Sequence, residues 1–90
     1  MLKIEHEGQI ISIIYRNEDW VKGLNFITPD EMFVQVGSWW YDKGKKLASH
    51  VHNDFDRIAS RTQESVYVKR GSMKVVLYTE QKEYLQEYTL

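Results

Sequence analysis

Apolar and polar residues alternate with a period of two along much of the chain, a pattern typical of β-strands. The runs LKIEH (residues 2–6) and QIISIIYR (residues 9–16) are rich in β-branched and aromatic residues, with only Glu7 and Gly8 between them. Two such runs around a short polar turn predict an antiparallel hairpin.

Residues 17–32 interrupt this alternation. The stretch contains Gly23 and the only proline of the chain, Pro29. Both residue types punctuate regular structure, so we predict a connection with one helical turn at most, begun by Thr28 and Pro29.

Alternation then resumes and predicts five further strands, with a hairpin turn at Gly44 and a long polar connection over residues 53–63. We find no amphipathic helix of useful length and no internal repeat. Many short strands with turn signals between them indicate a β-sandwich or a small barrel. The five predicted strands are residues 33–41, 46–52, 64–69, 73–80 and 83–90.

Composition limits the classes of protein to consider. Ninety residues make one domain, 1–90, which buries only about two-thirds of the surface of its unfolded chain. A net charge of −1 lacks the basic excess of a nucleic-acid-binding protein. Without cysteine, any metal must be bound by imidazole, carboxylate or water. No apolar run has the length of a signal peptide or a membrane span, so we expect a cytoplasmic protein that contacts no membrane.

Two of the three histidines, His50 and His52, lie one residue apart in a predicted strand. Side chains at positions i and i+2 of a strand share a face and stand roughly 7 Å apart, so the two imidazoles can converge on one ligand. Glu64 opens the predicted strand 64–69 on the face of its valines, which we expect to point inward. An inward carboxylate is costly unless it is paired or binds a cation.

These residues resemble the first conserved motif of the cupin superfamily, the small metal-binding β-barrels. Five residues separate Gly44 from His50, one separates His50 from His52, and six separate Glu64 from Gly71. The resemblance implies an all-β, cupin-like barrel or jelly roll. It also implies that His50, His52 and Glu64 bind a divalent transition metal (Fe, Mn, Zn, Ni or Co).

The resemblance extends over residues 33–90 and departs from the family pattern twice. The connection 53–63 is longer than usual, and the second cupin motif is missing. We therefore expect a barrel that is incomplete at its C-terminal end and is completed by a homodimer or by a complementing chain. Trp39 or Trp40 is predicted to lie in that interface, because consecutive residues of a strand face opposite sides.

Three functions fit this reading. The first is a metalloprotein that acts on a polar small molecule such as a sugar or nucleotide-sugar, oriented by Arg57 or Arg61 of the long connection. The second is a non-catalytic module that binds a metal or a sugar. The third is one half of a split barrel without activity of its own. The residues leave the question of catalysis open, and they name no substrate.

Overall fold

The computed structural model describes residues 1–90 and is built almost entirely of β-structure. Its elements are β1 (Leu2–His6), β2 (Gln9–Ile14), a 3-10 helix η1 (Asn17–Asp19), β3 (Gly23–Phe26), β4 (Gly37–Trp40), β5 (Lys74–Tyr78) and β6 (Tyr84–Thr89). The all-β prediction is confirmed. None of these elements is a helix with the length and apolar character of a membrane span.

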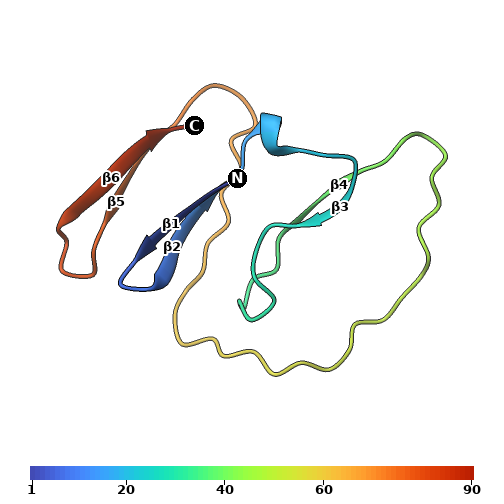
Figure 1. The fold of residues 1–90 in the computed structure, drawn as a ribbon, viewed down its shortest axis with the longest axis horizontal. Helices are drawn as coiled ribbons and strands as arrows, with labels where there is room; N and C mark the ends of the chain where they lie inside the picture. Colours follow the sequence, from blue (N-terminus) through green and yellow to red (C-terminus); the bar gives the residue numbers. More distant parts are fainter.

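The six strands form three antiparallel hairpins, β1–β2, β3–β4 and β5–β6, each a two-stranded sheet of its own. Figure 1 shows the three hairpins as separate pairs of arrows, with the segment after β4 running as an open arc to β5. No sheet closes into a barrel. The sequence therefore predicted the strand class correctly, whereas the closed arrangement of a cupin jelly roll is not seen.

The first hairpin forms where the sequence predicts it. Glu7 and Gly8 have φ angles of 51° and 76°, the left-handed values of a type I′ turn, and this turn matches the twist of the flanking strands. A register shift after Ile4 marks a β-bulge. Ile4 and Ile14 are the two buried apolar residues of the chain, so the core of the molecule lies on this hairpin.

The second hairpin corrects the prediction that residues 17–32 form a connection with at most one helical turn begun by Thr28 and Pro29; the 3-10 turn lies at Asn17–Asp19 instead. Gly23–Phe26 is a strand, and it pairs with Gly37–Trp40 so that Leu24 lies opposite Trp39. Gly23 begins the strand with a φ of 100°, which a glycine adopts without steric cost. Leu24 and Phe26 alternate with polar residues, which favours a strand. The nearby Gly23 and Pro29 favour a break in regular structure, and the prediction followed them.

Two predicted strands, 46–52 and 64–69, are wrong. Both segments have the alternating residue pattern of a strand. In the structure neither has a partner strand, and therefore neither forms a ladder of hydrogen bonds. Val66 is 65% exposed and Glu64 is also exposed, so of the face expected to point inward only Val68 is half-buried. Alternation identifies a chain that is suited to a sheet, but only a neighbouring strand makes it one.

Hydrogen bonds near Asp19 link the first hairpin to the second. The Asp19 carboxylate accepts hydrogen bonds from the chain's terminal ammonium group at 2.5 Å and from the Arg16 backbone N–H at 2.8 Å. The Tyr15 hydroxyl donates to the Asp19 carbonyl at 3.0 Å and also lies 3.0 Å from the Ser38 hydroxyl. These bonds hold the turn η1 against β4.

The chain is much more open than a compact domain of its size. Its accessible surface is 8207 Å², whereas a compact monomer of this mass exposes about 5,500 Å². Its radius of gyration is 15.8 Å, against about 12 Å for a compact chain of this length. Only 26 backbone–backbone hydrogen bonds form. A large apolar surface is therefore left in contact with solvent.

Candidate metal and ligand site

His50 and His52 lie together, as the sequence predicts. Their ring centres are 5.0 Å apart and the rings are inclined at 71°. Two imidazoles on one metal ion, with metal–nitrogen bonds of about 2.1 Å, have ring centres roughly 4.5 to 5.2 Å apart. The separation lies in this range, and with the 71° inclination it is also that of an edge-to-face ring pair.

The hydrogen bonding of His50 suits such a role. Its Nδ1 atom lies 3.4 Å from the Ala48 carbonyl oxygen. In the tautomer that carries the proton on Nδ1, this nitrogen donates to the carbonyl and the Nε2 lone pair is free for a metal ion. Metal-binding histidines commonly have their second nitrogen held in this way.

The third predicted ligand, Glu64, does not join the histidines. No three His, Cys, Asp or Glu side chains of the structure gather into a group that could hold a metal ion. Glu64 lies at the far end of the connection 53–63, in a segment with no strand to hold it near the histidines. The carboxylate of the expected three-ligand set therefore does not lie with the two imidazoles.

An apolar cavity of about 230 Å³ adjoins both histidines. Its floor is one face of the β3–β4 hairpin, where Leu24, Phe26 and Trp39 project to the same side because they alternate along their strands. The chain after the Gly44 turn crosses this face and brings His50 and His52 to its edge. Aromatic walls beside polar side chains are a common form of ligand site.

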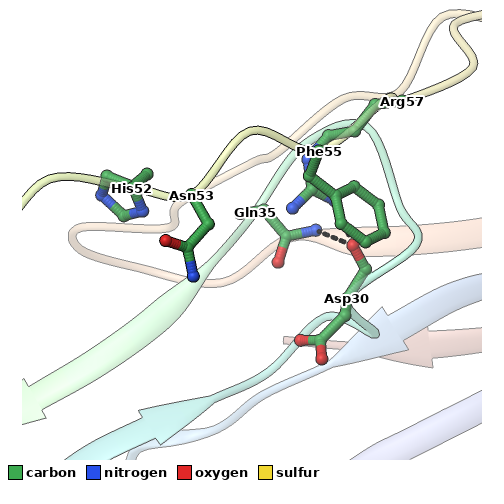
Figure 2. A pocket seen from close by; sticks show the side chains of 6 residues that line it. All are labelled: Asp30, Gln35, His52, Asn53, Phe55 and Arg57. Atoms are coloured by element: carbon green, nitrogen blue, oxygen red, sulfur yellow. Dashed lines mark hydrogen bonds between the residues drawn. The ribbon is translucent and has the colours of Figure 1, made fainter.

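A second, polar cavity of about 440 Å³ lies on the other side of His52. Figure 2 shows its lining, with His52 and Asn53 on one segment and Gln35 and Asp30 facing them from the loop between β3 and β4. The Gln35 side chain donates hydrogen bonds to the carbonyl oxygens of Pro29, Asp30 and Met32, which fix this loop. His52 lines both cavities and marks the boundary between them.

Arg57 lies in the polar cavity, and its guanidinium group is partly engaged. One nitrogen, Nη1, donates hydrogen bonds to the carbonyl oxygens of Asp30 and Met32, the latter at 2.8 Å. The guanidinium also lies over the Phe55 ring, 4.6 Å from its centre. Arg57 thus anchors its segment through Nη1, while Nε and Nη2 donate no hydrogen bond within the chain.

Arg61 does not lie with these residues. Its guanidinium pairs with the Glu80 carboxylate, and both side chains are exposed. Gln63 is the other anchor of the connection 53–63, because its side chain amide exchanges hydrogen bonds with the backbone of Val34 at 3.1 and 3.3 Å. Of the two predicted ligand-binding arginines, only Arg57 thus lines a cavity that His52 also lines.

The sequence prediction missed several residues of this site. Phe26, Trp39 and Gln35 line the cavities, yet only Trp39 had been singled out, and then as an interface residue. The pairing of Leu24 with Trp39 brings the aromatic wall together. Recognition of Gly23–Phe26 as a strand would have revealed this wall in advance.

Comparison of the chain with protein-family models, with curated proteins and with solved structures finds no match.

Proposed function

We propose that this chain is a small cupin-like metalloprotein that binds one divalent transition metal ion through His50 and His52. The observation that carries the proposal is the 5.0 Å separation of the two imidazole rings at the boundary of two cavities. Bound there, the metal supplies Lewis acidity or a coordination position for a ligand. Water and the Glu64 carboxylate are the candidates for the remaining positions.

The ligand that suits these cavities is a small molecule with an apolar ring face and a polar or anionic end. Trp39 and Phe26 offer exposed aromatic surface for the ring face, and the free donors of Arg57 suit a phosphate or carboxylate. A sugar phosphate or nucleotide-sugar has both features. Binding of such a ligand is the function proposed, whether or not a reaction follows.

Metal content is the test of the proposal. We would purify the chain without a polyhistidine tag, saturate it with Co²⁺ or Zn²⁺, remove free metal and determine the bound metal by elemental analysis. About one ion per chain is expected. The double variant His50→Ala/His52→Ala should retain almost none, whereas His6→Ala should retain the full amount, because His6 is a strand-end histidine that faces Glu7 at 3.7 Å.

The variant Glu64→Gln tests the third ligand. If Glu64 swings into the site when the metal binds, this variant should weaken metal affinity at least about tenfold, while the two histidines still give residual binding. If water completes the site, affinity should stay unchanged. Full metal content in the double histidine variant would overturn the proposed function.

A further inference from the structure

The Gln63 side chain forms a clamp on the loop between β3 and β4. Its Oε1 atom accepts a hydrogen bond from the Val34 N–H at 3.1 Å, and its Nε2 atom donates to the Val34 carbonyl oxygen at 3.3 Å. Nε2 also lies 3.7 Å from the Met32 sulfur. One side-chain amide thus takes both backbone groups of Val34, the pair of bonds that an antiparallel partner strand forms. We call this contact the Gln63 clamp.

The clamp is shielded in part from water. Gln63 and Val34 are half-buried, whereas Thr62 and Glu64 on either side of Gln63 are exposed. The Val34 N–H forms no hydrogen bond with the backbone, so its only partner within the chain is Gln63. Exchange of this one amide hydrogen with solvent therefore reports whether the clamp is closed.

The clamp also fixes the position of Glu64, the residue that follows Gln63. Consecutive Cα atoms are only about 3.8 Å apart, so a clamped Gln63 holds the Glu64 backbone beside Val34. There the Glu64 side chain is exposed and joins no group of metal ligands with the histidines. Gln35, the neighbour of Val34, faces His52 across the polar cavity (Figure 2). The carboxylate is thus held beside the loop that borders this cavity and away from the imidazoles.

The chain is long enough for Glu64 to reach the histidines once the clamp opens. Arg57 anchors the connection 53–63 independently of Gln63, and it lines the same cavity as His52. The seven residues 58–64 span up to roughly 24 Å when extended, which is ample for a return to that cavity. On the other side of Glu64, residues 65–73 lie in no strand and leave the carboxylate free to move.

We propose that the Gln63 clamp is an autoinhibitory contact of the metal site, which holds Glu64 off until the metal binds. This inference rests on the proposed function and adds its regulation. A neutral imidazole pair offers a carboxylate no opposite charge, so the clamp stays closed in the metal-free chain. A divalent cation at His50 and His52 supplies that charge and draws Glu64 in as the third ligand. Binding then opens two hydrogen bonds, which weakens metal affinity roughly tenfold or more.

Hydrogen exchange of the Val34 amide, measured by NMR on the full chain, tests the proposal. This amide should be protected in the metal-free chain, and saturation with Zn²⁺ should speed its exchange at least about tenfold. The Val36 N–H, which donates to the Thr28 hydroxyl at 2.9 Å in the same loop, is the internal control. Its exchange should be the same with and without Zn²⁺.

Two variants separate the clamp from the ligand. In Glu64→Gln, which keeps both histidines, Zn²⁺ should leave the exchange of Val34 unchanged. Gln63→Ala should expose the Val34 amide without any metal and should bind Zn²⁺ about tenfold more tightly than the unmodified chain. That gain should vanish in Gln63→Ala/Glu64→Gln. Gln81→Ala, at an exposed glutamine between β5 and β6, is the matched control and should bind Zn²⁺ like the unmodified chain.

Zinc content of the same samples separates this proposal from the proposed function. If the unmodified chain binds no zinc, the metal site and the clamp mechanism are both overturned. If zinc binds and the Val34 exchange stays unchanged, only the clamp mechanism is overturned. Equal zinc affinity of Gln63→Ala and the unmodified chain, or a gain that persists in Gln63→Ala/Glu64→Gln, also overturns it. The exchange measurement on the unmodified chain decides the matter even if Gln63→Ala fails to fold.

Discussion

The hydroxyl groups of Tyr15 and Ser38 lie 3.0 Å apart and join the end of β2 to the middle of β4. Ser38 is the most deeply buried side chain of the chain, and Tyr15 also donates to the Asp19 carbonyl. Since no strand of the first hairpin pairs with a strand of the second, this contact carries much of the connection between them. The aromatic face proposed as the ligand wall is positioned through it.

Removal of either hydroxyl should loosen that connection. Tyr15→Phe and Ser38→Ala should each lower the free energy of unfolding by about 1 kcal/mol, the usual net value of one hydrogen bond. Urea unfolding of the two single variants and of the double variant gives the coupling energy. We expect the double variant to cost clearly less than the sum of the two single variants. Strict additivity would show that the contact does not stabilise the fold.

The Asp19 carboxylate should make stability depend on pH at the acid end. The terminal ammonium group and then the Arg16 backbone N–H hold the pKa of this carboxyl below its ordinary value. The folded pKa lies below the unfolded one, so the stabilisation is complete above about pH 5. It is lost as the pH falls through the folded pKa.

The variant Asp19→Asn isolates this contribution. It should lower the urea midpoint at pH 7, and this difference from the unmodified chain should shrink as the pH falls through the lowered folded pKa of the aspartate. The comparison cancels the other carboxyl groups, which titrate in both proteins. A difference between the two proteins that stays constant from pH 7 to pH 2 would contradict the assignment.

The turn of the first hairpin should be improvable by one substitution. Glu7 holds a φ of 51°, a left-handed conformation that asparagine tolerates better than glutamate. Glu7→Asn creates the Asn-Gly pair that type I′ turns prefer, and it should raise stability by about 0.5 kcal/mol. Gly8→Ala, at a φ of 76°, should lower stability by about 1 kcal/mol. Thermal unfolding followed by circular dichroism measures both changes.

Arg57 and Arg61 should differ sharply when each is replaced by alanine. Arg57→Ala removes the bonds to Asp30 and Met32, so the connection 53–63 should become accessible to protease, and binding of an anionic ligand should weaken. Arg61→Ala removes one exposed ion pair with Glu80, and such pairs contribute about 0–1 kcal/mol. Metal content should stay unchanged in both. If the two variants resist protease equally, Arg57 does not anchor the connection 53–63.

Local sequence signals predicted the first and third hairpins because their information lies within a few residues. Glu7 and Gly8 specify a turn, and the register of β1 and β2 follows from it. The β5–β6 hairpin likewise forms around a short turn, in which the Lys82 backbone N–H donates to the Thr79 carbonyl at 2.9 Å. Neighbouring strands of this kind need no information from the rest of the chain.

The β3–β4 hairpin and the segments 46–52 and 64–69 could not be predicted in the same way. Pairing of Leu24 with Trp39 spans a loop that contains Pro29, and the strand before it begins at Gly23. Both residues indicate a break in regular structure, so only the tertiary structure decides for the hairpin. The same limit applies to Glu64. Its distance from the histidines depends on how the connection 53–63 folds. His50 and His52 are near each other because only one residue separates them, but no strand fixes them, and their 5.0 Å ring separation is shorter than the roughly 7 Å expected on a strand.

The bound metal of the unmodified chain, compared with that of His50→Ala/His52→Ala, tests the central claim most directly. Both proteins are purified without a polyhistidine tag, loaded with Co²⁺ and freed of excess metal, and cobalt is then measured per chain. The account predicts about one ion per chain for the unmodified protein and almost none for the double variant. Equal cobalt content in the two proteins, or none in either, would contradict it.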